Sequence, residues 1–142
     1  MKAQEELQKI LLDDAKINSK LEELARLNAL AARVTAAMDS EIVSRTRNTD
    51  SLSDAIIKII EMRDEINNLI DSYVDRKAHY SKIIDGLTNP MQIRVLYGHY
   101  YAGKSFQQIA DELGYSRRNI CYIHGDALRS MENFLQKEKV FP

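Results

Sequence analysis

The most constraining stretch of the chain runs from Lys104 to Met131. Ser105 is followed three residues later by Gln108, a capping-box pair that predicts the start of a helix. Gly114 comes one short helix later, where a left-handed residue ends a helix without a Cβ clash. Ser116 then offers a second N-cap. This stretch therefore predicts two helices joined by a tight turn.

The spacing across this turn is typical of a helix-turn-helix. Ala110 lies where the two helices would cross, and Gly114 follows four residues later. Ile120, six residues after the glycine, would anchor the second helix to a core. In DNA-binding proteins the second helix of such a pair enters the major groove. The alternative is an ordinary helix hairpin in a small α domain, but a small residue, a glycine and a branched apolar residue in register favour DNA binding.

The second helix is amphipathic at about 100° per residue. Its apolar face holds Ile120, Ile123, Ala127, Met131 and Phe134. The opposite face holds Arg118, Tyr122, Gly125 and Arg129, flanked by Arg117 and Cys121. With Ser116 and Asn119, these are the candidate DNA-binding residues.

Arg117 and Arg118 lie in the first turn of this helix, where positive charge opposes the helix dipole. Such a placement is expected if an anionic partner lies there, because arginine binds guanine bidentately or pairs with phosphate. Gly125 costs about 1 kcal/mol against alanine in a helix interior. It either lets DNA approach the backbone closely or is a tolerated surface glycine.

The residues from Leu87 to Met131 resemble region four of bacterial sigma factors, the helix-turn-helix that reads the promoter −35 element. They are more similar to phage-encoded relatives of that module, including the ArpU-like late-transcription regulators and a related, uncharacterised phage family of similar size. The phrases GKSFQQIADELGYSRRNI and IHGDAL carry most of the resemblance, and LEELARLNALAARVT and DAIIKIIEMRDEINNLID extend it toward the N-terminus. The resemblance implies that the base- and phosphate-contacting positions are Ser116, Arg117, Arg118, Cys121 and Tyr122.

The chain also departs from the sigma pattern. Sigma factors often have a charged or amide residue where this chain has Cys121 and Tyr122. The resemblance therefore implies no −35-like sequence preference. The other promoter-reading regions of a sigma factor have no visible counterpart, which speaks against independent initiation.

The N-terminal part predicts two long helices. The first runs from about Glu5 to Met38, with apolar residues every seven positions at Ile10, Ile17, Leu24, Ala31 and Met38. A polar connection follows from Asp39 to Asp50, in which Arg45 and Arg47 either touch phosphate or are solvated. Ser51 or Ser53 would begin the second helix, which ends near Ile84. Its heptad seam consists of Leu52, Ile59, Ile66, Tyr73 and Tyr80, supported by Ile56, Ile70 and Ile84. Repeats of this length are typical of a coiled coil or a helical hairpin, within one chain or between chains.

A third helix is expected from the cap Asn89 and Pro90 to Gly103, after Gly86 ends the second. The predicted fold is therefore all-α, with residues 1–86 as a long two-helix coiled-coil or oligomerisation region. Residues 87–142 form the sigma region-four-like helix-turn-helix domain. Composition agrees, because the 142 residues include only five glycines and two prolines, with 44% hydrophobic and 29% charged residues.

No catalytic site is visible. The three histidines, His79, His99 and His124, lack metal-ligand spacing and are expected at surface or boundary positions. The chain has no phosphate-binding glycine loop and no nucleophile elbow. We therefore expect neither enzymatic activity nor a cofactor or metal.

The remaining features point to the cytoplasm of a bacterial host. Cys121 is the single cysteine, so no intrachain disulfide can form. Acidic residues interrupt the apolar N-terminal residues, which argues against a secretory signal. No apolar run approaches the length of a membrane span, so no membrane partner is expected.

These observations favour a DNA-binding transcription regulator, encoded by a phage or prophage, whose partner is double-stranded DNA. The net charge is −3 over residues 1–86 and +2 over residues 87–142. So small a basic excess predicts modest affinity per protomer, and we expect a homodimer. One alternative is a sigma-like adaptor that binds host RNA polymerase. Another is a small terminase subunit in DNA packaging.

Overall fold

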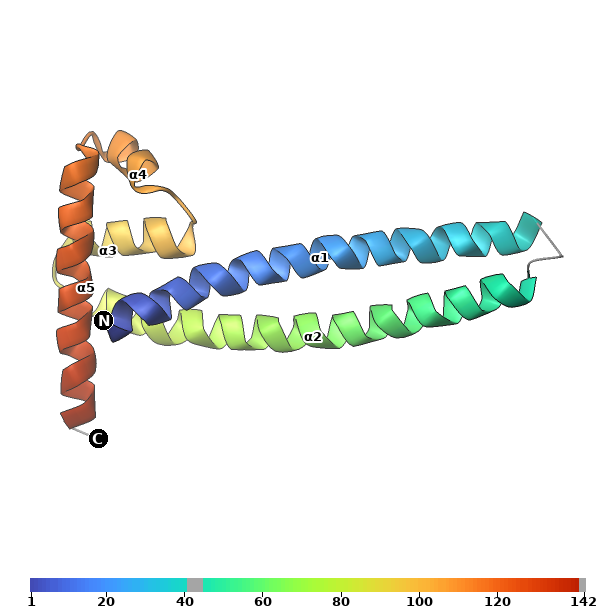
Figure 1. Ribbon diagram of the computed structural model, residues 1–142. Helices are drawn as coiled ribbons and strands as arrows, with labels where there is room; N and C mark the ends of the chain where they lie inside the picture. Colours follow the sequence, from blue (N-terminus) through green and yellow to red (C-terminus); the bar gives the residue numbers. More distant parts are fainter. Residues whose placement is uncertain (41–44, 141–142) are drawn as a thin grey trace. The chain divides into compact units, whose positions relative to one another are not determined.

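The computed structural model describes residues 1–40 and 45–140, and side chains for residues 1–37 and 50–138. It contains two long helices, α1 (Lys2–Ser40) and α2 (Arg45–Asp85), then four shorter elements (Figure 1). These are α3 (Pro90–Leu96), the π-helix η1 (Tyr97–Tyr101), α4 (Phe106–Leu113) and α5 (Arg117–Val140). No strand occurs in the described residues, and the predicted all-α class is confirmed.

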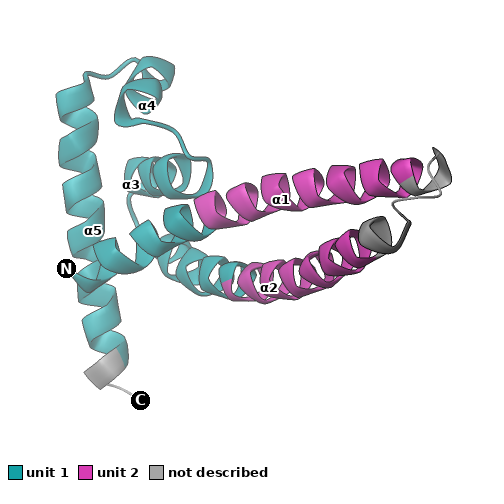
Figure 2. Ribbon diagram, turned by 45° about the vertical axis from the view of Figure 1, so that its right-hand side comes forward, with its two compact units in different colours: residues 1–13, 73–142 teal, residues 14–72 magenta. Residues whose placement is uncertain are grey.

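Contacts divide the chain into two compact units, drawn in different colours in Figure 2. One unit holds residues 1–13 and 73–142, and the other holds residues 14–72. Both long helices contribute to both units. The domain boundary at residue 86 stays a prediction.

In the unit of residues 14–72, α1 and α2 lie side by side and run in opposite directions (Figure 1). The two long helices thus pair within one chain. Their buried described residues are few: Ile17, Ala55, Ile59 and Ile66. An ion pair at 2.9 Å between Lys20 Nζ and Glu65 Oε2 also joins the two helices.

The seam of α2 differs from the prediction in its supporting positions. Ile59 and Ile66 are buried as expected, but Ile56 and Ile70 are 45% and 36% exposed. Ala55 is buried in their place. A coiled-coil seam alternates steps of three and four residues, and the step of three from Leu52 selects Ala55. Where the residues three and four positions along are both apolar, as Ala55 and Ile56 are, the sequence alone does not show which of them lies in the seam.

The start of α2 also differs. The helix begins at Arg45 and not at Ser51 or Ser53. No proline or glycine lies between Arg45 and Ser53, so the polar residues there do not prevent a helix. The suggestion that Arg45 and Arg47 touch phosphate concerns side chains outside the described residues.

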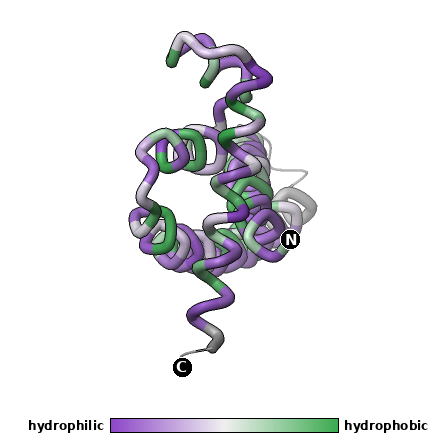
Figure 3. Tube along the Cα trace, turned by 90° about the vertical axis from the view of Figure 1, so that its left-hand side faces the viewer, coloured by the Kyte–Doolittle hydropathy of each residue, from purple (hydrophilic) through white to green (hydrophobic). Residues whose placement is uncertain are grey.

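The other unit has the larger core, and it is built from segments far apart in the sequence. In its main cluster the first turns of α1 and the end of α2 pack with α3, η1 and α5. The fully buried members from α1 are Ala3, Leu7 and Ile10, each 0% exposed. They meet Ile83 and Ile84 from α2. Their remaining buried neighbours are Tyr80, Leu96, Tyr100, Ala127, Leu128, Met131 and Leu135. In Figure 3 polar and apolar residues alternate along the helices, as amphipathic packing requires.

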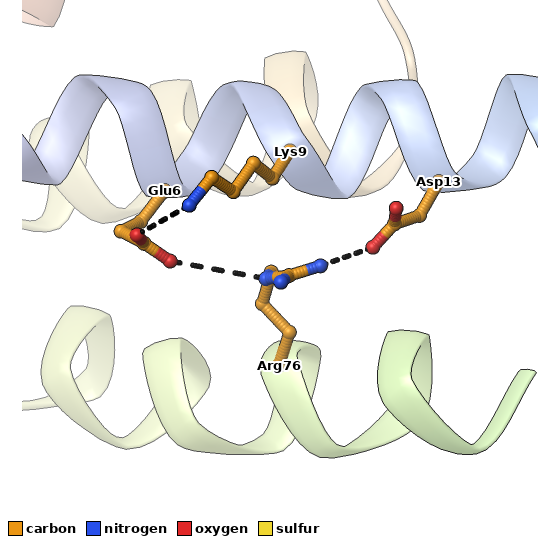
Figure 4. A network of polar contacts seen from close by, with 4 residues as sticks. All are labelled: Glu6, Lys9, Asp13 and Arg76. Carbon is orange, nitrogen blue, oxygen red and sulfur yellow. Dashed lines mark hydrogen bonds and ion pairs between the residues drawn. The ribbon is translucent and has the colours of Figure 1, made fainter. Parts of the chain in front are cut away.

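A polar network joins the beginning of α1 to α2 inside this unit (Figure 4). The Arg76 guanidinium pairs with the Asp13 carboxylate and lies 3.8 Å from Glu6 Oε2. Lys9 Nζ donates to Glu6 Oε1 at 2.9 Å, and this bond holds the pKa of the Glu6 carboxyl below its usual value despite desolvation. The half-buried arginine thus has two carboxylate partners, so its charge is compensated.

Short-range signals set the remaining helix boundaries. Gly86 directly follows α2. The Asn89 side chain accepts hydrogen bonds from the backbone N–H groups of Met91 and Gln92, and Pro90 occupies the first turn of α3. The predicted cap is confirmed. The expected single third helix is divided, because the chain passes from α3 into the π-helix η1 before Gly103.

Candidate nucleic-acid interface

The turn between α4 and α5 has the predicted geometry. Ser105 Oγ accepts from the Gln108 N–H at 3.1 Å, and Gln108 Oε1 accepts from the Ser105 N–H at 2.8 Å. Gly114 is left-handed, with φ 72° and ψ 27°, and the Tyr115 N–H donates to the Ala110 carbonyl at 2.9 Å. This capping box and left-handed glycine confirm the predicted ends of α4.

Ser116 is the cap of α5. Its Oγ accepts from the Asn119 N–H at 3.1 Å, and its carbonyl accepts from the Ile120 N–H. The first helical residue is Arg117. Ser116 therefore sets where α5 begins and where its first arginines point.

A small core holds the two helices together. Val95, Ile109, Ala110 and Ile120 are 0–2% exposed and form one cluster. Ala110 and Ile120 thus occupy the crossing and anchor positions that their spacing predicts. A Cβ on Gly98 would lie 3.3 Å from Cδ1 of Ile109, so η1 packs tightly on α4 at this glycine.

The inward face of α5 agrees with the prediction except at its far end. Ile120, Ala127 and Met131 are fully buried, whereas Phe134 is 38% exposed. Leu135 is buried where Phe134 was expected. Leu135 lies four residues after Met131 and seven after Leu128, which is also buried, so the buried line continues through it.

The outward face brings the candidate DNA-binding residues together on α5. Its exposed members are Ser116, Arg117, Arg118, Asn119, Cys121, Tyr122 and Arg129, and Gly125 is half-buried. These residues extend along α5 from its cap at Ser116 to Arg129, the thirteenth residue of the helix.

The arginines on this face differ in their side-chain partners. Arg118 Nη2 and Nε lie 3.1 and 3.3 Å from the Tyr122 hydroxyl oxygen, and the guanidinium lies 5.6 Å from the ring centroid. Arg129 pairs with Asp126. Neither Arg117 nor Arg118 forms an ion pair with any residue in the described ranges. Among the described residues, the first turn of α5 therefore carries two arginines without an ion-pair partner.

An aromatic cluster beneath α5 was not predicted. The Tyr100 hydroxyl lies 2.7 Å from Nε2 of His124, and the His99 ring stacks on Phe106 with centroids 4.3 Å apart. Burial lowers the pKa of His124 to about 4, and the nearby His99 contributes less. Burial also raises the pKa of Tyr100 to about 12. His99 and His124 are half-buried, in agreement with the expectation that they lie at surface or boundary positions. Their clustering shows no periodic signal, since the residues lie in three different elements.

Two tyrosines fix η1 to the end of α2. The Tyr97 hydroxyl donates to Asp85 Oδ1 at 2.6 Å and lies 2.6 Å from Ser81 Oγ. The Tyr101 hydroxyl donates to the Lys77 carbonyl at 2.6 Å. Desolvation raises the pKa of both hydroxyls. The π-helix is therefore held on one side by α2 and on the other by α4 and α5.

A mostly apolar groove of about 620 Å³ lies among α3, η1 and α4. Its lining includes Ile93, Arg94, Tyr97, Gly98, Ile109 and Leu113. None of its lining residues belongs to α5. The groove is thus a second surface feature of this domain, separate from the α5 face.

Residues 86–133 match the family Sigma-70, region 4. The matched span runs from the residue after α2 through α3, η1 and α4 into α5, and Sigma-70 region 4 is a family of DNA-binding helix-turn-helix domains. The predicted resemblance is confirmed for this segment. No curated protein and no solved structure matches the chain.

Two further findings concern other kinds of site. The described part of the chain holds no cluster of three or more His, Cys, Asp or Glu side chains able to bind a metal. None of its helices has the length and apolar character needed to cross a membrane.

Proposed function

We propose that this protein is a sequence-specific DNA-binding transcription regulator encoded by a phage or prophage. It reads the major groove with α5, the helix that Ser116 caps. The observation that carries this proposal is the uncompensated pair Arg117 and Arg118 in the first turn of the exposed α5 face, within a region 4 domain. Recognition helices contact base edges mainly through their first turns.

The geometry suggests a division of roles. Arg118, held by Tyr122, reads a base edge, because a guanidinium that is already oriented loses less freedom on bidentate binding. Arg117 binds phosphate from the edge of the helix, and Arg129 does so after releasing Asp126. Asn119 and Cys121 complete the surface that faces the bases.

Two further features fit this function: the glycine at position 125 of α5 and the expected dimer. A Cβ on Gly125 would have only Arg129 Nη2 within 4 Å, at 3.9 Å, so protein packing does not require this glycine. Close approach of a DNA backbone does explain it. The small basic excess of residues 87–142 is compensated by dimerisation, which places two α5 helices on one DNA molecule.

Selection of bound duplexes from a random pool, with the purified full-length protein, tests this function. We expect an enriched motif with two half-sites, protected from cleavage by the protein alone. No enrichment over input, at low salt as well as at physiological salt, would contradict the proposal.

A second candidate is a sigma-like adaptor that binds host RNA polymerase, and the groove among α3, η1 and α4 favours it. Arg94 lies exposed at this groove. In an adaptor, Arg94→Glu weakens polymerase binding and leaves binding of DNA alone unchanged. Footprints with and without polymerase separate the two candidates, since an adaptor protects DNA only with polymerase present.

A further inference from the structure

Helix α2 carries an apolar stripe that α1 does not cover. Its members are Ile56, Ile60, Ile70 and Val74, with exposed fractions of 45%, 54%, 36% and 54%. Ile57, 53% exposed, widens the stripe at one end. In residues 14–72, large apolar side chains are more often exposed than buried among the described residues, which marks an interaction surface.

The order of residues along this stripe is symmetric. Two isoleucines, Ile56 and Ile60, are followed by Arg63 and Asn67 and then by Ile70 and Val74. The steps between successive members alternate between four and three residues, which is the spacing of a coiled-coil seam. The pattern reads apolar–apolar–polar–polar–apolar–apolar and is centred on residue 65.

We infer that two copies of this chain pair antiparallel through the α2 stripe, about a two-fold axis near residue 65. Ile60 then faces the partner's Ile70, and Ile56 faces the partner's Val74. Arg63 faces the partner's Asn67. Such an interface is self-complementary, as a two-fold contact requires.

The charges select this direction. Parallel pairing would place Arg63 against the partner's Arg63, which costs free energy by repulsion. In the antiparallel pair Asp64, beside the stripe, approaches the axis in both copies. Each Arg63 then lies next to the partner's Asp64, so the arginines and carboxylates at the axis compensate one another.

The stripe also fixes the register. A shift of one heptad would set Ile60 against the partner's Arg63 and Ile56 against the partner's Asn67. Only the register centred near residue 65 matches all apolar positions with apolar positions. The proposal therefore commits to a second copy as the occupant of this surface.

This interface deepens the homodimer of the proposed function and rests on that part of it, but it does not depend on DNA binding. Sedimentation equilibrium of the full chain measures the dimer directly. Ile60→Glu should raise the dissociation constant of the dimer more than about tenfold, because each interface would then bury two carboxylates without partners.

Leu12→Glu is the matched control, because Leu12 is 53% exposed and belongs to α1, not to the stripe on α2. It should leave the dimer intact. Circular dichroism checks that both variants keep their helical content. A wild-type protein that stays monomeric at micromolar concentration overturns the inference, as does a dimer that Ile60→Glu leaves unchanged.

Crosslinking tests the direction of pairing. In a Cys121→Ser background, the double variant Ile60→Cys with Ile70→Cys should form covalent dimers with a short bismaleimide. Either single variant should not, because an axis near residue 65 separates equivalent Ile60 positions by ten residues, or about 15 Å of helix. Efficient crosslinking of the single variants would show parallel pairing and overturn the antiparallel model.

Charge reversal tests the axis. Arg63→Glu should weaken the dimer, and Arg63→Glu combined with Asp64→Arg should restore it. Failure of the restoration would contradict the placement of these residues. DNA selection keeps the two proposals separate, because a wild-type dimer that binds no DNA contradicts the function and leaves the interface standing.

Discussion

The Tyr100 hydroxyl lies 2.7 Å from Nε2 of His124, so a hydrogen bond joins the π-helix η1 to the helix proposed to read DNA. A neutral His124 can accept this bond from the tyrosine, whereas a protonated His124 would be charged in a half-buried site. The orientation of α5 thus depends on a side chain whose charge is tied to pH.

Lowering the pH should therefore destabilise the region 4 domain. The folded pKa of His124 is about 4 against 6.5 for the unfolded residue, so the unfolded chain binds more protons between these values. The stabilisation is present above pH 6.5 and is lost as pH falls toward 4, with a total of about 3 kcal/mol. Urea unfolding at a series of pH values measures it.

His124→Gln should remove this part of the pH dependence, and His79→Gln should keep it, because His79 is exposed. Acidic residues titrate in the same range in all three proteins, so the difference between variants isolates His124. Identical slopes for the two variants would contradict the assignment.

Truncation of Leu7 should destabilise the helix-turn-helix domain although Leu7 lies in α1. Its side chain is fully buried in the cluster that includes Met131 of α5. Leu7→Ala should cost about 2–5 kcal/mol of unfolding free energy. Leu12→Ala, at a position 53% exposed, is the control and should cost far less. Equal effects of the two variants would show that the first turns of α1 do not belong to this core.

Gly114→Val should destabilise the turn between α4 and α5. Gly114 has φ 72°, and a left-handed conformation costs an ordinary L residue about 1–2 kcal/mol, with more expected for a β-branched side chain. Thermal unfolding measures the loss. Gly114→Asn should be milder, since asparagine tolerates this conformation better. An unchanged melting temperature for the valine variant would mean that the turn adopts another geometry.

Gly125→Ala should separate stability from DNA binding. The new methyl group meets only Arg129 Nη2, at 3.9 Å, and alanine favours a helix over glycine by about 1 kcal/mol. The variant should therefore unfold at higher temperature but bind the selected DNA more weakly. Unimpaired DNA binding would show that Gly125 is only a surface glycine.

Arg118→Ala should relax specificity at one base position of the selected site, at a cost of about 1–3 kcal/mol. Arg117→Ala should instead weaken all sequences about equally and lower the salt dependence of binding. Binding isotherms on the selected site and its single-base variants distinguish the two. If both variants bind as the wild type does, α5 is not the recognition helix.

The sequence predicted those features that depend on neighbouring residues. Ser105, Gly114 and Ser116 each act through hydrogen bonds or dihedral angles within a few positions, and each has its predicted role. The same holds for Asn89 before α3. For the candidate DNA-binding face, the helical period was enough to gather its residues on one exposed side.

The features that escaped prediction depend on packing between distant segments. Ala55 and Ile56 are both apolar, so only the partner helix decides which is buried. His99, Phe106 and His124 come from different elements and share no period. The place of Leu7 in the same core as α5 has no local signal either.

The backbone N–H of Ala3 donates to Glu132 Oε2 at 2.9 Å, a contact between residues 129 positions apart. During translation, the first turns of α1 leave the ribosome long before the helix that completes their core. Until α5 emerges, these first turns have only their neighbours from α2, α3 and η1, and cores that need such distant segments form slowly. A nascent chain that stops before Glu132 therefore lacks this closing contact, so the core beneath the proposed DNA-binding helix is completed only late in synthesis.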